Sequence, residues 1–209
     1  MPAIFGLPLG TTQDGLSFAG ALASTDVLPY YQAGTILVMA AANGINQPNA
    51  SRVSGLGAVW ETAGKAYGAG TWKARADMCI GRVFRPAISN AVAISDGGTV
   101  RYIFAFVPTR GRPVGSTIFG SYQVVLLDGQ AGGAKTIGPI TSLYKGIAVC
   151  SYGMAEGHGH TPSGWTNIYC VEVGDGYGFC YKQVGAGESV SATFASATYS
   201  TAAVMGIFH

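Results

Sequence analysis

Short runs of apolar and aromatic residues, separated by glycine and proline, form the main hydrophobic pattern of this chain. The clearest runs span residues 100–107, 122–128, 146–152, 167–173, 178–184, 189–195 and 203–208. Short apolar runs bounded at close intervals by turn residues are typical of the strands of a β-sandwich or barrel. Helical periodicity is plausible only in Glu61–Tyr67, where Gly64 weakens it. The pattern therefore predicts an all-β protein with antiparallel strands.

The two halves of the chain resemble each other. Residues 8–15 read PLGTTQDG and residues 113–120 read PVGSTIFG, 105 positions later. Trp60 and Trp165 have the same spacing, although the chain has only three tryptophans. Apolar segments follow in the same order in both halves, with an offset that drifts as loop lengths change. The repeat predicts that the chain arose by internal duplication.

The duplication gives an expected domain organisation of two tandem antiparallel β-sandwiches with a jelly-roll-like topology. The first domain spans residues 1–108 and begins with an uncharged arm, Met1–Gly10, which we expect to dock on a neighbouring surface. The second domain spans residues 109–209. The boundary is expected near residues 108–113, which contain two prolines, a glycine and two arginines. Trp60 and Trp165 are expected to fill the two cores, as large aromatic side chains do.

Composition narrows the class of protein. Hydrophobic residues make up 48% of the chain, charged residues only 11%, and the formal net charge is +2. The high hydrophobic fraction and the low charged fraction argue against disorder, and the weak net charge gives no indication of nucleic-acid binding. The longest apolar stretch, residues 36–42, is too short to span a bilayer. The N-terminus lacks the features of a signal peptide, so we expect synthesis in the cytoplasm without membrane association.

Candidate catalytic and metal-binding residues are sparse. His158 and His160 alternate beside Glu156 and would share one face of an extended segment, which could bind a divalent metal. The interspersed glycines favour a loop without metal, and neither a metal nor a cofactor is expected. The sequence contains no nucleophile elbow or phosphate-binding loop, so we do not expect an enzyme. Hydrolysis by paired carboxylates stays open as a weaker alternative.

The cysteines and the aromatic residues near turns suggest further features. With a three-residue turn at 174–176, Cys170 and Cys180 would lie opposite each other, within reach of a disulfide. Cytoplasmic synthesis favours buried free thiols instead. Trp72 has no counterpart in the other half, and Tyr177 lies beside a turn. Together with His158 and His160, these two residues are the candidates for contact with a glycan or a partner protein.

The second half resembles a β-sandwich module found in structural proteins of tailed bacteriophages. The residues that carry the resemblance are a glycine-led strand (146–152), Pro-Ser-Gly-Trp (162–165), Tyr-Lys-x-Val (181–184), Gly-Glu-Ser (187–189) and the paired strands in 190–208. The first half matches only weakly. The resemblance implies a virion component, such as a tail fibre, head spike or capsid-decorating protein. Its partners would be other virion proteins and copies of itself, with recognition of a host-surface glycan as the alternative.

Overall fold

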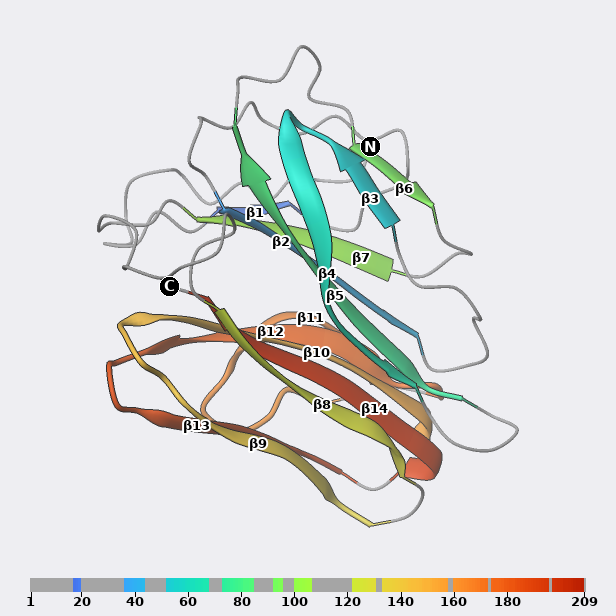
Figure 1. Ribbon diagram of the computed structural model, residues 1–209. Helices are drawn as coiled ribbons and strands as arrows, with labels where there is room; N and C mark the ends of the chain where they lie inside the picture. Colours follow the sequence, from blue (N-terminus) through green and yellow to red (C-terminus); the bar gives the residue numbers. More distant parts are fainter. Residues whose placement is uncertain are drawn as a thin grey trace.

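The protein consists of β-strands joined by turns throughout the part of the chain that can be described (Figure 1). The computed structural model describes residues 17–19, 36–43, 52–67, 73–84, 92–95, 100–106, 122–130, 133–157, 160–172, 174–195 and 197–208. All strand pairs in its sheets are antiparallel. The predicted all-β antiparallel class is therefore confirmed. No helix in these residues is long and apolar enough to cross a bilayer.

Each half of the chain contributes a set of strands in sequence order. The first half contains β1 (Ser17–Ala19), β2 (Ile36–Asn43), β3 (Arg52–Gly55), β4 (Ala58–Tyr67), β5 (Arg75–Val83), β6 (Val92–Ser95) and β7 (Val100–Phe106). The second half contains β8 (Tyr122–Gln130), β9 (Lys135–Thr141), β10 (Gly146–Gly157), β11 (Thr166–Val171), β12 (Tyr177–Val184), β13 (Ser189–Phe194) and β14 (Ala197–Phe208). Each of the seven apolar runs of the sequence pattern overlaps a strand.

The strands form one five-stranded sheet in each half, and the two sheets have the same strand order. The first sheet runs β1-β7-β2-β5-β4, and the second, written from the corresponding edge, runs β8-β14-β10-β12-β11. A further pair, β3 with β6, belongs to the first half, and β9 with β13 belongs to the second. The first sheet therefore takes all its strands from residues before 108, and the second takes all its strands from residues after it.

A β-bulge occurs at corresponding places in the two sheets. In β4 the register shifts between Thr62 and Gly64, opposite Cys79 and Met78 of β5. In β11 it shifts between Asn167 and Tyr169, opposite Cys180 and Phe179 of β12. A bulge inserts an unpaired residue and bends its strand. The two bulges lie 105 positions apart in the sequence, the same spacing as Trp60 and Trp165.

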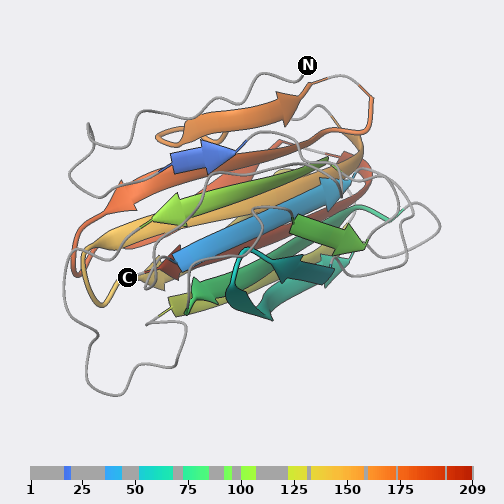
Figure 2. The same ribbon diagram turned by 90° about the horizontal axis from the view of Figure 1, so that it is seen from above.

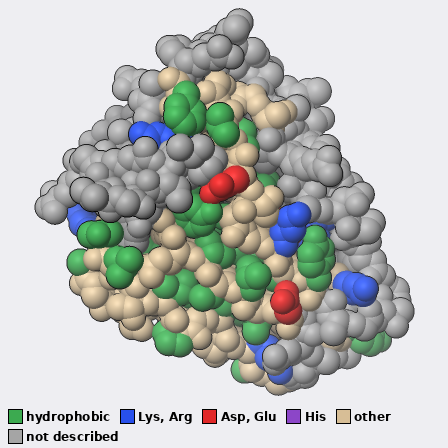
Figure 3. Space-filling model, in the orientation of Figure 1, with side chains coloured by type: hydrophobic (Ala, Val, Ile, Leu, Met, Phe, Trp, Pro, Cys, Tyr) green, Lys and Arg blue, Asp and Glu red, His purple; other side chains and the backbone are tan. Residues whose placement is uncertain are grey.

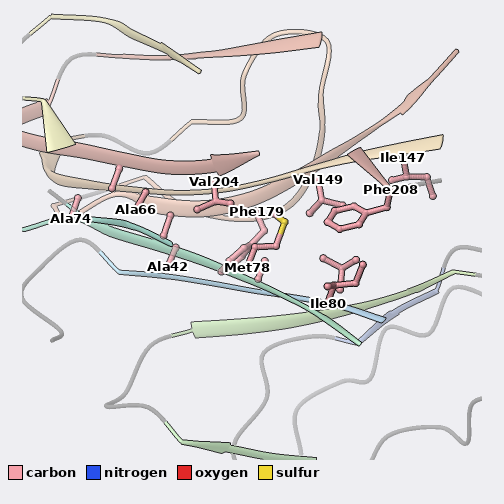
Figure 4. Packing of buried hydrophobic residues seen from close by; sticks show 14 of the residues in the cluster. Ala42, Ala66, Ala74, Met78, Ile80, Ile147, Val149, Phe179, Val204 and Phe208 are labelled. Carbon is pink, nitrogen blue, oxygen red and sulfur yellow. The ribbon is translucent and has the colours of Figure 1, made fainter. Parts of the chain in front are cut away.

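The inner faces of the two sheets enclose the first hydrophobic core. Figure 4 shows Met78 and Ile80 of β5 pointing toward Phe179, Val204 and Phe208 of the second sheet. All five side chains are at most 1% exposed. Figure 2 shows the strands of the two sheets running in roughly similar directions, as in an aligned sheet-on-sheet packing. This core therefore depends on side chains from both halves.

A second core lies on the outer face of the second sheet. The small sheet of β9 and β13 covers this face, at the bottom of Figure 1. It contributes Ile137, Ile140, Val190, Ala192 and Phe194, all at most 6% exposed. Strand β13 alternates strictly between exposed and buried positions, as expected when one face packs on a core and the other meets water. The second half thus buries its large sheet on both faces.

Edge strands β4 and β8 hold the two sheets together along one side. The Tyr122 hydroxyl donates to Glu61 Oε1 at 2.6 Å, and the Tyr67 amide donates to Asp128 Oδ1 at 3.2 Å. Between these bonds Gly64 is buried, and a Cβ at this position would lie 2.9 Å from Leu126 Cδ2. Glycine is therefore needed where the two edges approach each other.

The expectation of a helical turn over Glu61–Tyr67 is wrong, because these residues belong to strand β4. They pair with β5 from Ile80 to Arg75, with the bulge in between. Cross-strand pairing and packing against the second sheet override the local alanine and lysine preferences. The expected arm at residues 1–10 and the domain boundary at 108–113 lie outside the described residues.

Candidate functional site

Trp165 anchors the loop before β11 onto the second core. Its side chain is 9% exposed, and its indole Nε1 donates to the Ser191 carbonyl of β13 at 3.1 Å. The Trp165 backbone amide donates to Pro162 O at 3.1 Å, which closes the Pro-Ser-Gly-Trp turn. The loop is therefore fixed by one aromatic plug and two hydrogen bonds.

Trp60 occupies a more exposed position in the first half. It lies in β4 opposite Gly81 of β5, and a Cβ at Gly81 would come within 2.7 Å of its ring. Its indole Nε1 donates to the Gly55 carbonyl at 3.3 Å, and the residue is partly buried. Both tryptophans thus donate to a backbone carbonyl, but only Trp165 is buried.

The Tyr-Lys-x-Val and Gly-Glu-Ser segments of the second half contact each other. Lys182 Nζ lies 2.8 Å from Glu188 Oε1, and Glu188 Oε2 accepts a hydrogen bond from the Gly185 amide at 2.9 Å. These contacts lower the pKa of Glu188, with the Lys182 hydrogen bond as the main cause. The two segments therefore form one ionic latch, Lys182–Glu188, at the turn between β12 and β13.

An apolar turn projects beside this latch. Leu143 is 60% exposed and Tyr144 is 47% exposed; we call this pair the apolar tip. Ser142 is buried at its base, where its hydroxyl donates to Tyr144 O at 2.5 Å and its amide donates to Glu188 O at 2.9 Å. The tip is thus a hydrophobic projection whose base is held by hydrogen bonds, a feature suited to contact with another protein. Sequence reasoning missed it, although an apolar pair inside a turn was visible.

Exposed hydrophobic side chains occur on both layers. Figure 3 shows hydrophobic side chains spread over the described part of the face in view, with Lys or Arg and Asp or Glu side chains scattered among them. Val59 and Phe84 are each 50% exposed, and the Arg82 guanidinium lies 5.9 Å from the Phe84 ring centroid. Leu126 of edge strand β8 is 47% exposed. Surfaces with exposed apolar side chains and little charge suit contacts with neighbouring chains.

The four predicted binding residues fall in different places. Trp72 and His158 lie outside the described residues. His160 is partly buried at the start of the loop that leads to Trp165. Tyr177 is the first residue of β12, and its ring centroid lies 6.1 Å from that of Tyr169 in β11. Burial is the main cause that raises the pKa of Tyr177, followed by its electrostatic and hydrogen-bond interactions with Tyr169.

The end of β10 near His160 is stabilised by an acidic side chain. Glu156 has a φ of 47°, and the register against β14 shifts at this residue. Its amide donates to Asp175 Oδ1 at 2.9 Å, while the Gly176 amide donates to Gly157 O at 2.9 Å. Asp175 therefore stabilises a bulge. No group of three or more His, Cys, Asp or Glu within the described ranges could hold a metal ion.

The expected opposition of Cys170 and Cys180 is wrong. Cys170 pairs with Gly178, while Cys180 lies between Asn167 and Cys150. Val171 pairs with Tyr177, so five residues separate the paired strands instead of the expected three, and the bulge after Asn167 shifts the register again. All four cysteines are free thiols. The Tyr152 hydroxyl fills the space above Gly178 and donates to Cys170 Sγ at 3.2 Å.

We predict that alkylation of the native protein modifies Cys170 before the other cysteines. Cys170 is partly exposed, whereas Cys79, Cys150 and Cys180 are at most 3% exposed. Burial raises the pKa of the Cys79 thiol to about 11 and also raises the pKa values of Cys170 and Cys180, so the greater exposure of Cys170 is what favours its modification. Iodoacetamide labelling followed by peptide mass spectrometry measures the order. Equally fast labelling of Cys150 or Cys180 would contradict this description of the core.

We also predict a loss of stability at high pH that depends on Tyr122. Burial, aided by the hydrogen bond to Glu61, raises the pKa of Tyr122 from 10.0 to about 12. The folded state thus holds the phenolic proton more tightly than the unfolded state, and this stabilisation is present below pH 10 and is lost as pH rises toward 12. Urea denaturation at increasing pH measures the effect. In Tyr122→Phe the loss of stability that comes from deprotonation of Tyr122 should be absent. If the free energy of unfolding falls with pH as steeply as in the unchanged protein, Tyr122 is not its cause.

Comparison with known proteins gives no match, whether to a family model, a curated protein or a solved structure.

Proposed function

We propose that the protein is a structural component of a tailed-bacteriophage virion that assembles through contacts with other virion proteins and with copies of itself. The proposal rests on the contacts made by the residues that give the second half its resemblance to phage modules. Trp165 of Pro-Ser-Gly-Trp plugs the second core, and Lys182 of Tyr-Lys-x-Val pairs with Glu188 of Gly-Glu-Ser. The residues that carry the resemblance thus cooperate in one scaffold.

The apolar tip is the contact surface that we assign to this function. Leu143 and Tyr144 project from a base held by Ser142, next to the Lys182–Glu188 latch. A hydrophobic projection loses little conformational freedom on docking when its base is already fixed. The tip therefore gives the proposed assembly role a defined surface.

We also propose that the two halves are copies of one module joined by duplication, as two tandem β-sandwiches with boundaries at 1–108 and 109–209. The equal strand order and the matching bulges in β4 and β11 support this proposal. The jelly-roll-like topology stays a prediction.

Recognition of a host-surface glycan is the second candidate function. The observation that favours it is the pair formed by Tyr169 and Tyr177, which pack against the first core but are partly exposed on strands β11 and β12 at one edge of the second sheet. Tyrosines combine an apolar ring with a polar hydroxyl, which suits stacking on sugar rings. Binding on a glycan array that is lost in Tyr177→Ala would support this function, whereas binding unaffected by the substitution would exclude Tyr177 as its site.

The location of the protein tests the first proposal. Particles purified from a lysate of the strain that carries the gene should contain the protein, and electron microscopy with a specific antibody should place it on the capsid or tail. The proposal fails if purified particles lack the protein while the lysate contains it.

We predict that Leu143→Ser combined with Tyr144→Ser abolishes incorporation into particles without unfolding the protein. Both side chains are largely exposed, so the expected change in the free energy of unfolding is within about 0.5 kcal/mol. Lys145→Ser alters an exposed residue of the same turn and is the matched control. Incorporation is measured by mass spectrometry of purified particles. Normal incorporation of the double variant would exclude the apolar tip as the assembly surface.

A further inference from the structure

The two large sheets stack with their central strands against each other. β2 is the third strand of the first sheet, β10 is the third strand of the second, and these two strands are in contact. On one side of this pair β5 contacts β14, where Met78 Sδ comes within 3.0 Å of a Cβ built on Gly206. Farther out, β4 contacts β8. Strands β2 and β10 therefore form the centre of the contact between the two sheets.

Exchanging the halves reproduces the centre of this stacking but not its sides. The shared strand order matches β2 with β10 and β5 with β12. The contact of β5 with β10 then has as its counterpart the contact of β12 with β2, and both contacts are present. Within the described residues, the contacts of β5 with β14 and of β4 with β8 have no exchanged counterpart of similar extent. The centre of the interface is therefore isologous, the arrangement of two-fold symmetric dimers, while its sides have diverged from that symmetry.

We infer that the inner face of this module is self-complementary at its centre and binds a second copy of the same module there, and that the present chain supplies both copies. This inference rests on the duplication proposed above and goes beyond it, because duplicated modules need not face each other. The first core is then an internalised dimer interface.

One position shows how the two copies have diverged. A Cβ at Gly64 would lie 2.9 Å from side-chain atoms of Leu126, Val124 and Val204. The matching position beside the second bulge is Tyr169, which packs against the same core from the other sheet. If a second C-terminal half replaced the N-terminal half, Tyr169 would meet the three side chains that leave room only for glycine. Gly64 and Tyr169 therefore favour pairing of unlike halves over pairing of like halves.

The test is cleavage of the folded full chain at a protease site inserted at Arg112, between β7 and β8. The fragments of the otherwise unchanged protein should remain a one-to-one complex in native mass spectrometry, because each covers the inner face of the other. In cleaved Tyr169→Gly protein, exchange between complexes should produce a new species with the mass of two C-terminal fragments. Tyr169→Ala provides a second variant that avoids the loss of stability caused by the conformational freedom of glycine within a strand.

Tyr144→Gly is the matched control, because it removes an exposed tyrosine from a turn outside both sheets. Its cleaved fragments should remain one-to-one. The inference is overturned if cleavage of the unchanged protein releases folded monomers, or if neither folded Tyr169 variant forms the C-terminal dimer. None of these results depends on incorporation into virions, so the proposed function and this inference can fail separately.

Discussion

Replacing Phe179 with alanine is expected to lower the free energy of unfolding by about 3–5 kcal/mol. Phe179 of β12 is fully buried in the core between the two large sheets. The substitution removes apolar surface from a packed site and leaves a cavity that the surrounding strands can fill only in part. Urea denaturation followed by circular dichroism measures the change.

Phe84→Ala is the matched control for this prediction. Phe84 is 50% exposed after the end of β5, so its loss is expected to change the free energy of unfolding by about 0.5 kcal/mol or less. The packing described here is wrong if Phe179→Ala costs no more than Phe84→Ala. A loss that unfolded the second half and left the first half intact would show that the core is not shared.

Replacing Trp165 with alanine is likewise expected to lower the free energy of unfolding by about 3–5 kcal/mol. The substitution removes the plug of the second core and leaves the Ser191 carbonyl without its indole donor. It should also release the loop that begins near His160. Thermal unfolding measures the loss of stability, and proteolysis measures exposure of the loop.

Trp60→Ala tests whether this cost reflects burial or only the loss of a tryptophan. Trp60 also donates to a backbone carbonyl, but it is only partly buried over Gly81. Its replacement should therefore destabilise the protein less than Trp165→Ala. Equal or greater destabilisation by Trp60→Ala would contradict the different burial of the two residues.

Local pattern was sufficient to predict the strands but not their register. Gly176 and Gly185 flank strand β12, so its position follows from the sequence. The bulges at Ala63 and Ile168 leave no local sequence signal, and a bulge shifts every later cross-strand pair. For this reason the Cys170–Cys180 pairing was predicted incorrectly. The helical turn in β4 was predicted incorrectly because strand pairing and packing override the local helical preference.

The packing of the two halves could not be predicted from the repeat. A repeat indicates that two modules are alike, but the contact of β2 with β10 joins segments about half the chain apart. Similarly, the sequence shows Pro162–Trp165, Lys182 and Glu188 as separate elements of the resemblance, whereas the ion pair between Lys182 and Glu188 depends on how β12 and the following turn fold. The apolar tip was missed because exposure depends on how the surrounding turns pack.

The central claim is that the two halves share one core and therefore unfold as one cooperative unit. Native-state hydrogen exchange in increasing urea, read by mass spectrometry on peptides from β2 and β10, tests it most directly. Both central strands are predicted to exchange through the same global opening, with equal free energies and equal urea dependence. Exchange of β2 through an opening that leaves β10 protected would contradict the claim, because the halves would then be independently stable domains.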